Sequence, residues 1–194
     1  MFIQSIAHRA EQLQQLLASM QYSTIVVEQL EPQYETGQLG CELAVKILAT
    51  AKKNNANVYL IGNGGSAAIV SHAKTDLMNV GKLKAITLLD SAIMTCFSND
   101  YGYENVFSRQ LDILANAEDV LIAVSSSGMS KNILNAVDMM RQKNAKVITL
   151  SGFKNNNDLR VSGDLNFWID SENYTLVEIA HLFILHHLAD CLKE

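Results

Sequence analysis

From residue 57 onward, short apolar runs alternate regularly with helical segments, and this alternation constrains the fold more than any other feature of the sequence. The runs are apolar over most of their length rather than alternating regularly with polar residues. Such runs are typical of parallel strands that are buried on both faces of a sheet. They span residues 58–61, 85–89, 120–124, 146–150 and 165–169. We therefore predict an α/β fold with a five-stranded parallel sheet.

In the segments between these runs, the apolar residues have the spacing that is typical of helices flanking a sheet. Helices are predicted at residues 67–80, 92–115 (with a break near 100–102), 131–143 and 171–192, and a loop at 152–163. In such sheets ligands bind beyond the carboxyl ends of the strands. Motifs that directly follow a strand are therefore the first candidates for a functional site.

Residues 1–54 have a different hydrophobic pattern, with apolar residues at helical spacing on both sides of Pro32 and Gly37. This pattern predicts an N-terminal helical hairpin, followed by a single sheet domain over residues 55–194. The hairpin has apolar surface that one small domain does not fully cover. It is expected to mediate oligomerisation, and the alternative is that it packs onto its own domain.

Composition excludes several classes of protein. The chain has 194 residues, which suffices for a full hydrophobic core, and a net charge of −5, which argues against direct nucleic-acid binding. It lacks an apolar stretch long enough to cross a membrane, and its first residues do not resemble a signal peptide. Cys41, Cys96 and Cys191 are widely spaced and odd in number, as expected for reduced thiols in a cytoplasmic protein.

The first apolar run ends in the motif Gly62-Asn63-Gly64-Gly65-Ser66, and a helix follows. Glycines allow the backbone to approach a ligand closely, and the helix N-terminus offers free N–H groups and a positive dipole end. The spacing matches neither a dinucleotide fingerprint nor a nucleoside triphosphate loop. The motif is consistent with an anion site or with a tight strand–helix turn.

A second motif, Ser125-Ser126-Ser127-Gly128-Met129-Ser130, follows the third run and also precedes a helix. Its hydroxyl and N–H groups can surround a phosphate without a lysine or arginine, because helix termini supply the positive field. The alternative is helix capping, which requires only one serine. Two such loops after strands of one sheet favour a phosphorylated ligand.

Together with Asn99–Gln110, which reads NDYGYENVFSRQ, the two motifs resemble the sugar isomerase (SIS) domain family, in its phosphoheptose isomerase branch. The resemblance covers nearly the whole chain. It implies a flavodoxin-like sheet, an N-terminal helical pair and a homotetramer. It also implies that a sugar phosphate is held by Asn63, Gly64, Gly65, Ser66, Ser125, Ser126, Ser127 and Ser130. Leu89 and Asp90 match a further substrate-contacting pair, although Leu89 replaces a hydroxyl residue that is common in the family.

His72 and Asp76 lie four residues apart on the predicted helix after the first motif, and therefore share a face. An imidazole and a carboxylate one turn apart form half of a zinc site, or a hydrogen-bonded pair on a helix surface. The family usually has glutamate at the position of Asp76, where it serves as metal ligand and catalytic base. Aspartate keeps the charge but is one methylene shorter.

The last helix supplies the other implied site residues. The resemblance places Glu178 at a position often occupied by glutamine, in contact with substrate, and His186 on the family's catalytic and metal-binding histidine. It implies one zinc ion per subunit, bound by His72, Asp76, Glu178 and His186. On a straight helix Glu178 and His186 are separated by about 12 Å along the axis. This spacing suggests an active site at a subunit interface.

The resemblance implies isomerisation of D-sedoheptulose 7-phosphate to D-glycero-D-manno-heptose 7-phosphate through an enediol intermediate. Asp76 is expected to be the base that moves a proton between adjacent carbons, and His186 its partner acid and base. Two alternatives remain. One is a non-catalytic protein of the same fold that binds sugar phosphates or a protein partner of the replication-initiator-associating type. The other is an isomerase of a different sugar phosphate.

Overall fold

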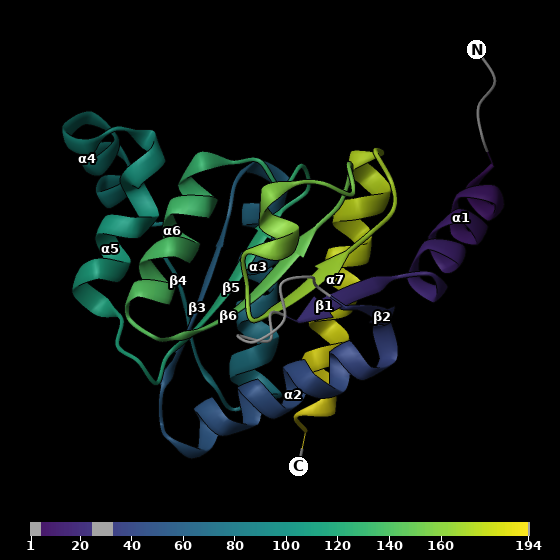
Figure 1. The fold of residues 1–194 in the computed structure, drawn as a ribbon, viewed down its shortest axis with the longest axis horizontal. Helices are drawn as coiled ribbons and strands as arrows, with labels where there is room; N and C mark the ends of the chain where they lie inside the picture. Colours follow the sequence, from purple (N-terminus) through teal and green to yellow (C-terminus); the bar gives the residue numbers. More distant parts are fainter. Residues whose placement is uncertain (1–4, 25–32, 194) are drawn as a thin grey trace.

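The computed structural model describes residues 5–24 and 33–193, which form a three-layer α/β structure around one sheet (Figure 1). The strands lie in the order β2-β1-β7-β6-β5-β3-β4. They are β1 (Gln21–Thr24), β2 (Gln33–Thr36), β3 (Asn57–Gly62), β4 (Lys84–Thr87), β5 (Val120–Ser125), β6 (Lys146–Ser151) and β7 (Leu165–Trp168).

The helices lie between these strands and at the chain ends. They are α1 (Ile6–Ala18), α2 (Gly37–Lys53), α3 (Gly64–Asn79), α4 (Ser91–Tyr101), α5 (Val106–Leu114), α6 (Lys131–Gln142) and α7 (Tyr174–Cys191), with 3-10 turns at Tyr103–Asn105 and Asp158–Val161. The predicted break near residue 100 is confirmed, because α4 ends at Tyr101 and Gly102 follows with a φ of 82°.

All five predicted strands are present and pair in parallel in the order β4-β3-β5-β6-β7. This is the flavodoxin-like order, in which the first strand of the series pairs with both the second and the third. The chain therefore leaves β3 in one direction across the sheet and β5 in the other. A crevice opens between the carboxyl ends of these two strands, at the topological switch point.

The predicted helical hairpin is wrong. The two helices exist, but between them the chain forms β1 and β2, which extend the sheet to seven strands. β1 pairs antiparallel with β7, and β2 pairs antiparallel with β1. Without β1, the open edge of β7 would present unpaired backbone groups, so covering this edge is the physical reason for the extra strands. Met20 and Tyr22 are buried there, and the sheet thus includes residues from both sides of position 54.

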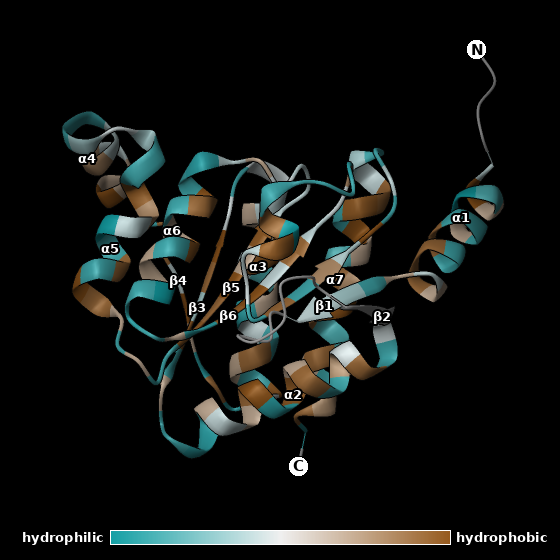
Figure 2. Cartoon of the chain, viewed as in Figure 1, coloured by the Kyte–Doolittle hydropathy of each residue, from teal (hydrophilic) through white to brown (hydrophobic). Residues whose placement is uncertain are grey.

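The sheet separates two apolar cores, because successive residues of a strand point to opposite faces. Val58 and Leu60 of β3 pack with α2, α3 and α7, whereas Tyr59 and Ile61 pack with α5 and α6. Figure 2 shows the apolar residues concentrated on the strands and on the helix faces turned toward them. α1 differs, since it has no buried residue and extends away from the sheet in Figure 1.

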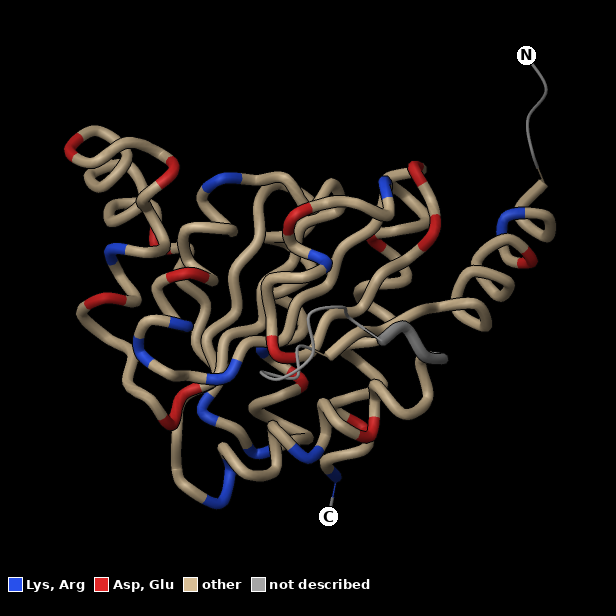
Figure 3. Tube along the Cα trace, in the orientation of Figure 1, with Lys and Arg blue, Asp and Glu red and all other residues tan. Residues whose placement is uncertain are grey.

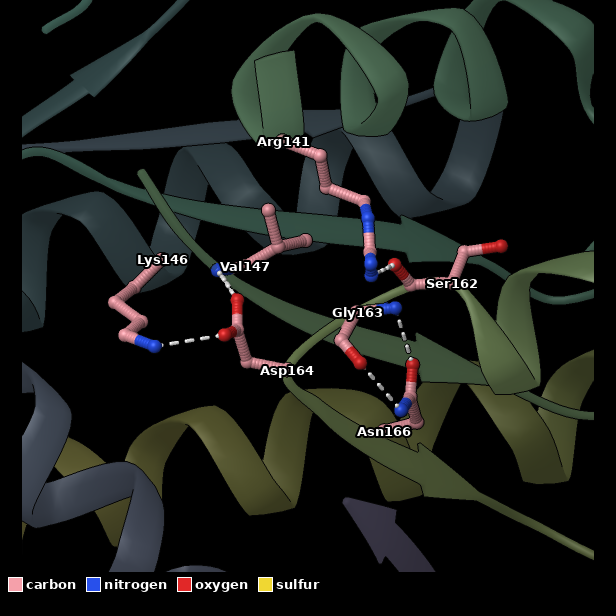
Figure 4. A network of polar contacts seen from close by, with 7 residues as sticks. All are labelled: Arg141, Lys146, Val147, Ser162, Gly163, Asp164 and Asn166. Carbon is pink, nitrogen blue, oxygen red and sulfur yellow. Dashed lines mark hydrogen bonds and ion pairs between the residues drawn. The ribbon is translucent and has the colours of Figure 1, made fainter. Parts of the chain in front are cut away.

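The turn into β7 is held by a polar network at the amino ends of β6 and β7 (Figure 4). The Asp164 carboxylate accepts hydrogen bonds from the backbone N–H of Val147 at 2.9 Å and from Lys146 Nζ at 2.8 Å. The Asn166 amide bonds to both the N–H and the carbonyl of Gly163. These contacts fix the register of β7, from which the chain continues to α7. None of the described helices has the length and apolarity required to cross a membrane.

Candidate active site

The two loops singled out in the sequence meet at the switch point between β3 and β5. They enclose a cavity of about 220 Å³, lined by Asn63, Gly64, Gly65, Ser66, Val124, Ser125, Ser126, Ser127, Ser130, Tyr174 and Glu178. All eight residues that were expected to hold a phosphate are among them. Tyr174 was not predicted, since it reaches the cavity from the start of α7 and its sequence context has no distinguishing pattern.

The first loop leaves the N-terminus of α3 without a side-chain cap, because the amide of Asn63 is bound elsewhere. Asn63 Nδ2 donates to Asn132 Oδ1 at 2.9 Å, and Asn132 Nδ2 donates back to Asn63 Oδ1 at 2.8 Å. Tyr103 also donates its hydroxyl to Asn63 Oδ1, at 2.9 Å. Asn132 lies in the first turn of α6, so this reciprocal pair ties the two loops together. The first-turn N–H groups of α3 have no partner within the helix.

Replacing Asn132 by alanine is expected to lower the free energy of unfolding by about 1–3 kcal/mol and to weaken phosphate binding. The substitution leaves both polar ends of the Asn63 amide with fewer partners and releases the first loop from the second. Asn135→Ala is the matched control. Asn135 is another asparagine of α6, and it donates to the chain at residues 104 and 105 but does not line the cavity. Urea unfolding and phosphate titration measure the two effects. Equal losses of phosphate affinity in both variants would contradict this role of Asn132.

The second loop presents hydroxyl groups to the cavity, and Ser130 does not cap α6. Ser125 Oγ donates to Ser130 Oγ at 3.2 Å, and Ser127 Oγ accepts from the N–H of Met129. Ser126 is 5% exposed, and its Oγ is buried without a hydrogen-bond partner. A buried hydroxyl without a partner costs free energy, and it calls for a ligand at this point.

The cavity wall contains no lysine or arginine among its described residues. Figure 3 shows most positive charges toward the lower half of the molecule, whereas the loops lie at its upper end. An anion in the cavity would therefore be held by hydroxyl groups and by a helix N-terminus rather than by a basic patch. This arrangement agrees with the expectation from the two motifs.

A second polar cluster lies farther along α3, where it packs against α7. His186 Nδ1 is 2.6 Å from Asp76 Oδ2, His72 Nε2 is 3.8 Å from the same oxygen, and the two imidazole rings are 5.0 Å apart in an edge-on arrangement. Asp76 Oδ2 is buried and has no well-directed hydrogen bond. One ligand atom of each of the three residues lies within 4.8 Å of the others, so they could together hold a metal ion.

Glu178 does not belong to this cluster within one chain, and its place among the implied metal ligands stays a prediction. Glu178 and His186 are eight residues apart on α7, about 12 Å along the axis. The Glu178 carboxylate lies instead over Gly65, at the wall of the anion cavity. The three remaining candidate ligands are His72, Asp76 and His186.

Leu89 and Asp90 lie outside the cavity that the described residues form. Asp90 is exposed and caps α4, with its Oδ1 accepting from the N–H groups of Ala92 at 3.0 Å and Ile93 at 3.1 Å. Leu89 is half-buried and packs against the apolar cores on both sides of the sheet. Within this chain both residues have structural roles, and their contact with substrate stays a prediction.

The other histidines of α7 lie away from the cluster. His181 is fully buried, and its Nε2 is 3.1 Å from the carbonyl oxygen of Ser151 at the end of β6. His187 lies on the helix surface, with Nε2 3.7 Å from Cys191 Sγ one turn later. These positions agree with packing and surface roles.

Burial lowers the pKa of His181 from 6.5 to about 4, and its hydrogen bond to Ser151 offsets this effect only in part. Between these pH values the unfolded chain binds a proton that the folded chain does not. Stability is therefore expected to fall as the pH decreases from about 6.5 to about 4, by about 3 kcal/mol in total. Urea unfolding at several pH values measures this loss. His181→Gln should remove it, and an unchanged pH dependence in that variant would assign the loss to other groups.

Comparison with known proteins agrees with this geometry. The SIS domain family model matches residues 21–152. The phosphoheptose isomerase of Helicobacter pylori strain P12 is 33% identical over 173 residues, which cover 86% of this chain and 90% of the relative. The chain belongs to the phosphoheptose isomerase family of SIS-domain proteins. The family match begins at the first residue of β1.

Solved structures of the same family have the same fold. The phosphoheptose isomerase of Neisseria gonorrhoeae superposes with a TM-score of 0.80 at 26% identity and covers 96% of both chains. A phosphoheptose isomerase from Francisella tularensis has a TM-score of 0.75 at 30% identity, covering 80% of this chain and 86% of the other. The α/β fold and the family expected from the motifs are thereby confirmed.

Proposed function

We propose that this chain isomerises D-sedoheptulose 7-phosphate to D-glycero-D-manno-heptose 7-phosphate. Its family membership makes it a sugar-phosphate isomerase. The observation that carries the proposal is the pairing of an anion cavity at the N-termini of α3 and α6 with an imidazole–carboxylate pair along α3 and α7. A binding protein needs the first of these features, whereas isomerisation needs both.

The cavity supplies the binding end of the site. We propose that the phosphate group accepts hydrogen bonds from Ser126 and its neighbouring hydroxyls, and from the first-turn N–H groups of α6. The reciprocal amide pair of Asn63 and Asn132 keeps the two loops at a constant separation, so the cavity is formed before the ligand arrives. Preformed polar sites bind with a smaller entropy cost than sites that must order on binding.

The second cluster supplies the proton-transfer end. Isomerisation moves a proton between adjacent carbons and another between their oxygens, so groups that accept and return protons are required. Asp76 Oδ2 lies 2.6 Å from Nδ1 of His186 and orients the imidazole ring. With no metal bound to the cluster, His186 then exchanges protons with the sugar through its other ring nitrogen. Besides His186, we propose Asp76 as the base that removes the proton from a sugar carbon, which is the role that the resemblance to the family implies.

We propose that zinc binds to His72, Asp76 and His186. Two imidazoles and one carboxylate match the donor set of catalytic zinc sites, and the buried Asp76 Oδ2, which lies 2.6 Å from Nδ1 of His186, is an oxygen that would bind the cation. Zinc bound there would act as a Lewis acid toward the carbonyl oxygen of the sugar. Metal analysis of the purified protein and of His72→Ala tests this, since the variant should retain less zinc whatever its activity.

We also propose that the chain is a homotetramer in which α1 contributes to the contacts between subunits. Ile6 on α1 is 89% exposed, and Ile179 and Phe183 are exposed on the face of α7 that carries His186. Apolar residues exposed together on one helix face mark a protein interface more often than an open surface. Light scattering measures the mass in solution. A monomeric mass in fully active protein would overturn both the assembly and a site shared between subunits.

Turnover tests the function directly. Purified protein is incubated with sedoheptulose 7-phosphate, with and without added zinc, and the aldose product is followed by chromatography. Formation of the aldose heptose 7-phosphate supports the proposal. Binding of this ketose phosphate without turnover at any zinc concentration would identify a non-catalytic protein. Turnover of other ketose phosphates alone would reassign the substrate.

A further inference from the structure

The anion cavity contains a negative charge of its own, on Glu178. Glu178 lies in the first turns of α7, is half-buried, and faces a cavity of about 220 Å³ that has no lysine or arginine in its described wall. A carboxylate in so small a space repels a second anion, because like charges a few ångströms apart interact strongly where water is partly excluded. The charge must therefore affect which ligands the cavity accepts.

The carboxylate lies at one end of the cavity. A Cβ atom placed on Gly65 would be 2.6 Å from Glu178 Cδ and would also overlap both carboxylate oxygens, so the carboxylate rests directly against the backbone at the start of α3. A helix N-terminus attracts negative charge through its free N–H groups and its dipole. The carboxylate thus lies beside the start of α3, where its charge would repel a second anion.

The other end of the cavity has no such occupant among the described residues. Ser130 leaves the N-terminus of α6 without a side-chain cap, and Ser126 Oγ, in the loop that leads to α6, is buried without a partner. The two helix N-termini that face the cavity are therefore not equivalent. The Glu178 carboxylate lies against the start of α3, and Glu178 is the one acidic residue of the described cavity lining.

We infer that Glu178 determines the orientation and specificity of ligands in this cavity. Its charge confines the phosphate to the serine loop at α6, and the α3 side of the cavity accepts an uncharged hydroxyl group of the sugar, which can donate a hydrogen bond to the carboxylate. The inference rests on the proposed function and adds a preference for ligands with one phosphate over ligands with a second anionic group near α3.

Titration with inorganic phosphate, followed by calorimetry at constant ionic strength, tests the inference. Glu178→Gln keeps the shape of the side chain and removes its charge, so phosphate affinity should rise by roughly tenfold. Glu178→Asp keeps the charge and should stay near the wild-type value. Glu172→Gln is the control, because Glu172 lies on the loop before α7 and does not line this cavity.

Equal phosphate affinity in wild type and Glu178→Gln would overturn the inference and leave the proposed isomerase function standing, since turnover is measured separately. A similar rise in Glu172→Gln would assign the effect to general surface charge and would also overturn it. A similar rise in Glu178→Asp would overturn it as well, because the shape of the side chain would then matter rather than its charge. Absence of phosphate binding in all variants would overturn both the inference and the proposed anion site.

Discussion

Replacing His186 by alanine is expected to lower kcat for ketose–aldose isomerisation by about 10²–10⁴-fold, the range that a positioned acid–base group contributes. Among the described residues, its imidazole is the one that comes within 3 Å of the Asp76 carboxylate, with Nδ1 at 2.6 Å from Oδ2. The substitution removes both the proposed proton carrier and the partner of a buried carboxylate oxygen. Steady-state kinetics with sedoheptulose 7-phosphate measures the loss.

His187→Ala is the matched control for this variant. His187 is the next residue along α7 but points to another side of the helix, where it lies close to Cys191. Its removal should leave kcat near the wild-type value. Phosphate affinity should be unchanged in His186→Ala, since His186 does not line the anion cavity. A His186→Ala enzyme that retains a tenth or more of wild-type kcat would require a different proton carrier.

Replacing Gly128 by alanine is expected to lower the free energy of unfolding by about 2–4 kcal/mol, from backbone strain together with a steric clash. Gly128 has a φ of 65°, and a Cβ atom there would overlap Oδ1 of Asn157. Asn157 is 2% exposed and cannot move aside easily. Its Nδ2 donates to the carbonyls of Gly152 and Lys154, and its Oδ1 accepts from the N–H of Arg160.

Gly64→Ala separates the two causes. Gly64 also has a positive φ, of 52°, but no atom lies within 4 Å of the position of its Cβ. The free energy of unfolding of Gly64→Ala should therefore fall by about 1 kcal/mol, from backbone strain alone. Urea unfolding of both variants measures the difference. Phosphate binding should also weaken in Gly128→Ala, because the serine loop must shift. Equal destabilisation of the two variants would show that Asn157 yields to the new methyl group.

The parallel part of the fold was predictable because its signal is local. Buried parallel strands are continuously apolar, so the five runs, such as the one in β5 (Val120–Ser125), are visible directly in the sequence. The strand β1 gave no comparable signal. It forms because β7 would otherwise be an open edge, and this depends on a strand more than a hundred residues away. Local periodicity therefore assigned residues 1–54 to a helical hairpin and did not show the strands between its helices.

The site residues also fall into two groups, those with a signal in the local sequence and those without one. The two loops were predictable because each is a short run of glycines or serines directly after a strand, and the resemblance identified His72, Asp76 and His186. The contributions of Asn132, Tyr103 and Tyr174 were missed, since each is an ordinary residue whose role comes from what it faces. The contact of the Glu178 carboxylate with Gly65 was also missed, because position along α7 does not show where this side chain turns, and its roles toward substrate and metal stay predictions.

By itself, the sequence determined the α/β class, the parallel strands of the core, the two phosphate-type loops and the family. These depend on the periodicity of side chains and on the residue types next to each strand, which are local properties of the chain. Only the tertiary structure decided which side chains meet. The packing of α3 against α7 brings Asp76 to His186 and places the Glu178 carboxylate in the anion cavity, because distances between helices are set by packing across the fold and not by spacing along the chain.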